Sequence, residues 1–480
     1  MENEDFKRSL GLKDGVLLVA GSMIGSGVFI VAADMVRNLG TGWWLLAAWL
    51  ITGIMTLTAA LSYGELAGMF PKAGGQYVYL KEAYNPLIGF LYGWSFFTVI
   101  QTGLIAAVAV AFAKFTGVLI PYFSEDNIYF TLGSFKLNHA QPLGIVLIMV
   151  ITYISTKGVE GGKLIQTVFT VAKFVALIGL IIGGFFFVKH SYFAENIAGG
   201  LNATKAVVNE ATTQTTWESI TGIALLGGIA AAMVGSIFSS DAWNSVTFIA
   251  GEMKRPERNI PLSLFFGTLI VTLVYILANA MYLNVLPLNE IANAPKDRVA
   301  TAVAEKIFGQ NNIEYGRYGA IFVAVMIMVS TFGCNNGLII SGARMLYTMA
   351  KDKLFLPQAA TLNANKVPAF ALWIQAAWAC ILALSGKYGQ LLDYVSFVVV
   401  IFYILTIAGV FILRIKQPNA IRPYKTFGYP IMPALYIVMG ITFCGMLLKF
   451  KPEFTWPGLG IVALGIPIYY LINNKKRVNV

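Results

Sequence analysis

Long apolar segments separated by short polar breaks cover nearly the whole chain. A helix needs about 20 apolar residues to cross the roughly 30 Å hydrocarbon core of a bilayer, and most of these segments reach that length. The pattern predicts twelve membrane-spanning helices near residues 14–36, 43–68, 87–118, 142–157, 163–188, 220–250, 261–284, 316–349, 368–386, 391–413, 429–448 and 454–473. We therefore expect an all-α membrane protein whose 480 residues form a single transmembrane domain.

The composition agrees with a membrane environment. Hydrophobic residues make up 57% of the chain and charged residues only 12%, whereas a soluble domain carries about 25% charged residues. Residues 1–13 are polar and charged and lack the apolar core and cleavage site of a signal peptide. The first span is thus expected to remain in the mature protein.

The basic residues predict the orientation of the chain. An even number of spans places both termini on one side, and the segments predicted on that side hold most of the Lys and Arg, including Lys7, Arg8, Lys13, Lys72, Lys81, Lys157, Lys163, Lys254, Arg255, Arg258, and the groups in 344–366, 414–425 and 475–477. Short cytoplasmic loops carry this excess in membrane proteins. We expect a multi-pass protein of the cell membrane with both termini in the cytoplasm. The net charge of +11 then needs no nucleic-acid partner.

Metal, cofactor and enzyme chemistry find little support. The cysteines Cys334, Cys380 and Cys444 lie far apart in apolar segments, and His139 and His190 lie in or beside polar connections. Neither set has the spacing of a metal site or a disulfide framework. No nucleophile, base and orienting group stand out as a set, so we expect no cofactor, no metal and no enzymatic activity.

Glycine and serine concentrate in the middle of the first span, in the sequence GSMIGSGVF at 21–29. One interpretation is a small-residue packing face formed by Gly21 and Gly25. The other is that the helix unwinds between Met23 and Gly27 and leaves free amides at the start of a second half-helix, where the helix dipole favours a carboxylate.

The sixth span repeats this feature in GSIFSSDAWNS at 235–245, five spans later. Matching interruptions in two halves of a transporter indicate a binding site near the bilayer midplane, between inverted repeats. Unwound backbone exposes both amides and carbonyls, which together suit the two charges of an α-amino acid. The alternative is that Ser236, Ser239 and Ser240 bond back to their own helix.

Two ionisable residues lie well inside predicted spans. A charge at the bilayer centre costs at least about 2.5 kcal/mol on insertion scales, so such residues suggest function. Lys173 in the fifth span is expected either to donate to the exposed carbonyls of the first span as an internal cation or to act as a structural tie. Asp241 in the sixth span either attracts a substrate cation or caps the second half of its helix.

Taken together, these segments resemble the amino acid, polyamine and organocation superfamily, and within it the L-type amino acid transporter family. The resemblance runs through most of the chain and is carried by 21–29, 70–84, 169–173, 238–244, 252–261, and 342–347 leading to Pro357.

The resemblance implies the leucine-transporter fold, with one repeat at about 14–188, an inverted second repeat at about 220–413 and two added helices at about 429–473. It also implies obligatory exchange by alternating access. The implied substrate-binding residues are Met23, Ile24, Gly25, Ser26, Gly27, Phe238, Ser239 and Asp241. In that family the carboxylate meets the positions of 25–27, the ammonium meets the carbonyls of 23, 238, 239 and 241, and the aromatic at 238 covers the substrate.

In the same family the position of Lys173 replaces the ion of sodium-coupled transporters, which implies sodium independence. Animal members pair with a glycoprotein through a cysteine between the third and fourth spans, but residues 121–141 contain none. This departure is typical of a prokaryotic member without a disulfide-linked heavy subunit.

We thus expect a sodium-independent antiporter of free neutral amino acids, small or aliphatic. Two alternatives stay open. Asp241 suits an exchanger of cationic amino acids or amines, and a titrating Lys173 suits a proton-coupled symporter or an ion channel.

Overall fold

The computed structural model describes residues 8–71, 74–132, 135–208, 215–385 and 388–478. Lys7 and Lys72, which entered the charge argument, lie outside this part of the chain. Within it, ten helices are long and apolar enough to cross a membrane. Two shorter apolar helices, Ala140–Thr156 and Ala369–Leu384, lie where the fourth and ninth spans were expected. The count of twelve and the inverted repeat stay predictions.

The first half of the chain supplies the first interrupted span and the helices that follow it. Its elements are α1 (Leu12–Met23), α2 (Gly27–Ile30), α3 (Ala32–Leu39), α4 (Gly42–Met69), α5 (Gln76–Ala83), α6 (Pro86–Ser95), the π-helix η1 (Phe96–Ile100), α7 (Gln101–Leu119), η2 (Pro121–Phe123), α8 (Ala140–Thr156), α9 (Val159–Phe186) and α10 (Phe193–Ala198). The segments α6, η1 and α7 follow one another without a break and form one span.

The second half supplies the second interrupted span and its neighbours. Its elements are α11 (Gly222–Ser239), α12 (Ser245–Phe248), η3 (Ala250–Glu252), α13 (Pro256–Val285), α14 (Leu288–Ala292), η4 (Pro295–Asp297), α15 (Val299–Phe308), α16 (Ile313–Lys351), η5 (Pro357–Ala360), α17 (Ala369–Ser385), α18 (Tyr388–Lys416), α19 (Ile431–Phe450) and α20 (Pro452–Val478).

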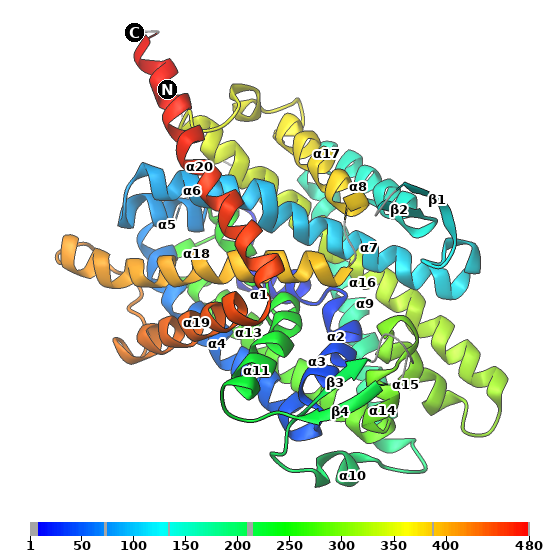
Figure 1. Ribbon diagram of the computed structural model, residues 1–480. Helices are drawn as coiled ribbons and strands as arrows, with labels where there is room; N and C mark the ends of the chain where they lie inside the picture. Colours follow the sequence, from blue (N-terminus) through cyan, green and yellow to red (C-terminus); the bar gives the residue numbers. More distant parts are fainter. Residues whose placement is uncertain (1–7, 72–73, 133–134, 209–214, 386–387, 479–480) are drawn as a thin grey trace.

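Two small β-hairpins depart from the all-helical expectation. Strands β1 (Ile128–Leu132) and β2 (Phe135–Asn138) pair antiparallel, as do β3 (Thr204–Val208) and β4 (Thr215–Ser219). Figure 1 shows them at separate places in the molecule, and β3 contacts α3. The hairpins and the short helices α5, α10 and α14 fall in the polar connections between spans, where hydropathy predicts no spanning element.

The burial of α9 shows how the helices face the bilayer. Apolar side chains three or four residues apart are exposed along one face, namely Val168, Val171, Val175, Ile178, Ile182 and Phe185. The opposite face buries Lys173, Leu177 and Leu180. An apolar stripe of this length on the outside of a helix suits a lipid solvent. Lys173 is therefore directed inward, where it contacts the first interrupted helix.

Candidate functional site between the interrupted helices

The first span is interrupted where the glycine cluster predicts. Helix α1 ends at Met23, and Ile24 leaves the helical conformation with φ −73° and ψ 89°. The amide of Gly25 donates to the Met23 carbonyl at 2.8 Å, and α2 begins at Gly27 with Ser26 as its N-cap. The prediction of unwinding between Met23 and Gly27 is confirmed. Gly25 also packs closely, because a Cβ there would lie 3.0 Å from Cys334 Sγ.

The sixth span is interrupted as well. Helix α11 ends at Ser239, α12 begins at Ser245, and Ala242 between them has φ 62°, a left-handed conformation that is uncommon for a residue other than glycine. Two serines do bond back to their own helix, as the alternative interpretation proposed. Ser239 Oγ donates to the Gly235 carbonyl at 2.7 Å and Ser236 Oγ to the Met233 carbonyl at 3.2 Å.

The two interruptions touch each other. A Cβ at Gly27 would lie 2.0 Å from Ser239 Oγ and 2.9 Å from Ser239 Cα, so only glycine permits this approach. Tyr275 of α13 joins the same two segments, because its hydroxyl lies 2.9 Å from the Met23 carbonyl and 3.0 Å from the Ser239 carbonyl. Sequence reasoning missed Tyr275, one of 22 tyrosines, because its hydropathy and spacing resemble those of any other tyrosine in a span.

Lys173 is 1% exposed and reaches the carbonyls of the first interruption. Its Nζ donates to the Ile24 carbonyl at 2.7 Å and also to the Gly21 carbonyl. Carbonyls at the end of a helix lack intrahelical donors, so the lysine supplies what the break removes. The expected contact is confirmed, while its functional role stays a prediction.

Helix α16 adds two further donors to the same carbonyl cluster. Ser330 Oγ lies 3.1 Å from the Ile24 carbonyl, and Cys334 Sγ lies 3.1 Å from the Ser22 carbonyl. The pattern of apolar positions does not single out either residue. The first interruption is consequently held from three sides, by α9, α13 and α16.

Asp241 is 5% exposed, and its carboxylate accepts a hydrogen bond from the Tyr403 hydroxyl of α18. The alternative role of Asp241 as a helix N-cap is wrong, because the N-cap of α12 is Asn244. The turn runs three residues further than the motif suggested before the chain becomes helical again. Among the described residues, no Lys or Arg forms an ion pair with Asp241.

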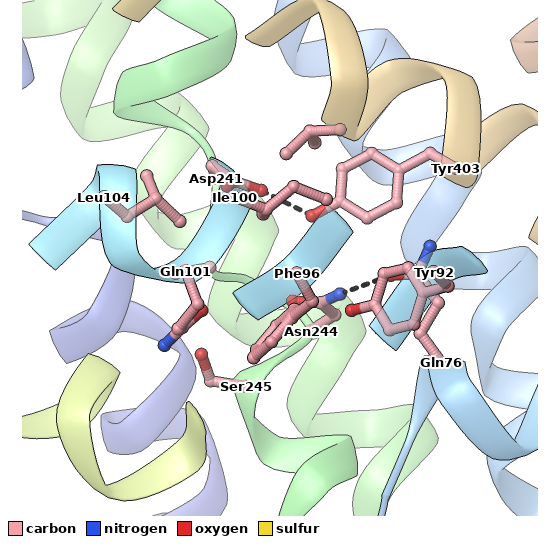
Figure 2. Close-up of a pocket in the computed structure, with 12 residues that line it drawn as sticks. Gln76, Tyr92, Phe96, Ile100, Gln101, Leu104, Asp241, Asn244, Ser245 and Tyr403 are labelled. Atoms are coloured by element: carbon pink, nitrogen blue, oxygen red, sulfur yellow. Dashed lines mark hydrogen bonds between the residues drawn. The ribbon is translucent and has the colours of Figure 1, made fainter. Parts of the chain in front are cut away.

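A small cavity adjoins Asp241 (Figure 2). It is lined by residues of α5, α6, η1, α7, the second interruption, α12 and α18, namely Gln76, Tyr92, Phe96, Ile100, Gln101, Leu104, Asp241, Ala242, Asn244, Ser245, Val399 and Tyr403. Helix α16 contributes no lining residue, whereas Gln76 of α5 does. The cavity volume is about 10 Å³, room for roughly one water molecule.

Ion pairs join the helices at both ends of the molecule. At one end Arg37 lies 2.8 Å from Asp297, which connects α3 to η4. At the other end Arg344 of α16 lies 3.1 Å from Glu252, and both side chains are less than a tenth exposed. Burial raises the pKa of Glu252, and the nearby Arg344 opposes part of that shift. The cavity beside Asp241 is too small to hold an amino acid in this structure.

Comparison with known proteins now identifies the class. The amino acid permease family matches residues 10–469, so the chain belongs to this family, a branch of the amino acid, polyamine and organocation superfamily, and is a multi-pass membrane protein. It is 30% identical to the serine/threonine exchanger SteT of Bacillus subtilis over 480 residues, 99% of each chain.

Animal relatives are also similar. The chain is 27% identical over 467 residues to the human large neutral amino acids transporter small subunit 2, covering 97% of this chain and 80% of the relative. It is 26% identical over 489 residues to the mouse b(0,+)-type amino acid transporter 1, covering 100% of this chain and 92% of the relative. The resemblance to the L-type family is thus confirmed.

Proposed function

We propose that this protein exchanges neutral, small or aliphatic L-amino acids across the cell membrane by alternating access and without sodium. The observation that carries the proposal is the meeting of two interrupted helices, one of which has its freed carbonyls bound by Lys173. Amides at the start of α2 have no acceptor within that helix. Together with the positive end of the helix dipole they suit a carboxylate.

The substrate is proposed to bind with its carboxylate at 25–27 and its ammonium at the carbonyls of 23, 238, 239 and 241. The Tyr275 hydroxyl shares its one proton between two of these carbonyls, but a carbonyl oxygen has two lone pairs and can accept a second donor. The Gly25 amide donates to the Met23 carbonyl in this structure. Binding of a carboxylate would therefore rearrange this short turn.

The buried ammonium of Lys173 supports sodium independence, since it fills with a fixed positive charge the carbonyl cluster that a metal ion would otherwise share. The relatives that match nearly the whole chain include a serine/threonine exchanger and a neutral amino acid transporter. Serine, threonine, alanine and leucine are accordingly the first substrates to test. We also propose that the protein works without a disulfide-linked subunit, with the inverted repeat and cytoplasmic termini that its sequence predicts.

The test is uptake of labelled amino acids into proteoliposomes, with and without internal amino acid, and with sodium replaced by choline. Exchange predicts uptake that requires internal substrate and is the same in choline. Protein-free liposomes give the background. Uptake into empty vesicles driven by a proton or sodium gradient would instead establish a symporter.

A second candidate function is exchange of cationic amino acids or amines. It is favoured by the position of Asp241, a buried carboxylate beside the cavity with no basic partner among the described residues. A substrate ammonium or guanidinium could supply the missing charge.

Asp241→Asn separates the two candidates. It keeps the shape of the side chain and an acceptor for Tyr403 while it removes the charge. If the carboxylate selects cations, arginine uptake falls at least tenfold and serine uptake changes little. Equal arginine uptake in both proteins would eliminate the cationic candidate.

A further inference from the structure

The short helix α5 enters the interior of the protein through two glycines. Gly74 and Gly75 have φ of 112° and 47°, conformations that other residues rarely adopt. A Cβ at Gly75 would lie 2.4 Å from Thr247 Oγ1 of α12. The glycine turn therefore packs directly against the second half of the sixth span. It places Gln76, the first residue of α5, in the lining of the cavity.

Gln76 is 1% exposed and joins three separate elements. Its Nε2 donates to Thr406 Oγ1 of α18 at 3.0 Å, and its Oε1 accepts from Asn244 Nδ2, just before α12, at 3.2 Å. Figure 2 shows the bond between Gln76 and Asn244 at the edge of the cavity, with both residues in its lining. Both ends of the buried amide thus have partners, as a buried polar group requires.

The rest of α5 is attached to α16 and α18. Lys81 Nζ and Tyr77 Oη donate to the Asp352 carboxylate, which follows α16, at 2.6 and 2.7 Å. Tyr84 Oη donates to the Leu405 carbonyl of α18 at 2.8 Å. Several bonds, one of them between opposite charges, thus connect this segment to α16 and α18. A single neutral hydrogen bond connects Gln76 to the residue before α12.

The position of α12 shows towards which side of the membrane the hydrogen bond between Gln76 and Asn244 lies. After α12 the chain reaches Glu252, whose carbonyl accepts from the amides of Ser9 and Leu10 at 3.0 and 3.1 Å. These two residues directly precede α1. The end of the cavity formed by Gln76 and Asn244 therefore faces the side of the membrane on which α1 begins, which the distribution of basic residues predicts to be cytoplasmic.

We propose that the hydrogen bond between Gln76 and Asn244 is a latch that closes the cavity towards the α1 side. Gln76 is then a positioning residue for alternating access, an inference that deepens the proposed exchange function. When the cavity opens towards the α1 side, α12 moves away from α5, which is attached to α16 and α18, and the hydrogen bond between Gln76 and Asn244 breaks. A neutral hydrogen bond is of the right strength for a latch, since its loss should raise the population of the open state by about fivefold.

The test uses thiol labelling, with no amino acid present. Ser245→Cys places a thiol in the lining of the cavity, and a membrane-impermeant maleimide is added to one side of oriented vesicles at a time. The rate is taken as the excess over protein without this cysteine. In the Gln76→Leu background we expect labelling from the α1 side to rise about fivefold and labelling from the other side not to rise.

Gln375→Leu is the matched control. Gln375 is equally buried and donates to the Ile339 carbonyl of α16 at 3.1 Å, but it does not line the cavity. Its replacement should leave the labelling rate unchanged. If Gln76→Leu fails to fold, Asn244→Ala removes the other partner and should have the same effect, and in a double variant that folds the effects should not add.

The latch would be overturned by an unchanged rate in both variants, by an equal rise in the Gln375 control, or by a rise from both sides of the membrane. Because labelling needs no substrate, its outcome is separate from that of the transport assay. A one-sided rise in a protein that exchanges no amino acid would uphold the latch and reject the proposed function.

Discussion

Gly27→Ala tests the contact between the two interrupted helices most directly. The added Cβ would lie 2.0 Å from Ser239 Oγ, 2.7 Å from Ser239 Cβ and 2.9 Å from Ser239 Cα. Rotation of the serine side chain can relieve the first of these contacts only. The other two involve Cβ and the backbone, so α2 must move away from α11.

Overpacking of a well-packed interior typically costs about 1 to 3 kcal/mol, and the shift falls on the proposed carboxylate site. We expect Gly27→Ala to lower the thermal midpoint and to reduce exchange at least tenfold. Adding Ser239→Gly removes the atoms at 2.0 and 2.7 Å but leaves Cα at 2.9 Å. The double variant should therefore recover part of both losses.

The assay is counter-exchange in proteoliposomes, paired with thermal unfolding of the purified protein. Gly445→Ala in α19 is the control, because a Cβ there meets no atom within 4 Å, and alanine favours a helix over glycine. The control should match the unchanged protein. Full exchange and an unchanged midpoint for Gly27→Ala, or no recovery in the double variant, would refute the reasoning.

Two further substitutions address the residues that hold the interruptions. Lys173→Met removes the charged donor to the first interruption. Since an unsatisfied buried carbonyl costs about 1 to 3 kcal/mol, we expect loss of exchange and a lower thermal midpoint. Normal exchange would show that the lysine is dispensable. Tyr275→Phe keeps the ring but removes the one hydroxyl proton that Met23 and Ser239 share, at a cost of about 0.5 to 1.5 kcal/mol, so exchange should slow several-fold. Tyr318→Phe, at an exposed site, should exchange at the full rate.

Local features of the site were predictable from residue type. The glycine cluster at 21–29 breaks the first span because glycine stabilises a helix poorly and tolerates conformations that other residues avoid. A lysine in an apolar segment must find oxygen partners, and Lys173 does so at the carbonyls freed by the break. Neither inference requires knowledge of a distant contact.

Other features were missed for an equally physical reason. The hairpins β1–β2 and β3–β4 lie in polar connections, where the hydropathy pattern carries no information on pairing. The role of Asp241 as an N-cap was wrong because the length of a turn depends on what packs around it. Here the Tyr403 hydroxyl of α18 binds the carboxylate, and the helix resumes at Ser245.

The sequence by itself determined which segments are apolar enough to cross a bilayer, where two of them are interrupted, and that a lysine and an aspartate lie within them. These properties follow from the hydropathy and backbone preferences of neighbouring residues. Only the tertiary structure decided that Tyr275 joins both interruptions, that Gln76 meets Asn244, and that the cavity beside Asp241 is small. Those contacts connect residues far apart in the chain, 252 positions for Tyr275 and Met23 and 168 for Gln76 and Asn244, and their geometry depends on how whole helices pack rather than on any local pattern.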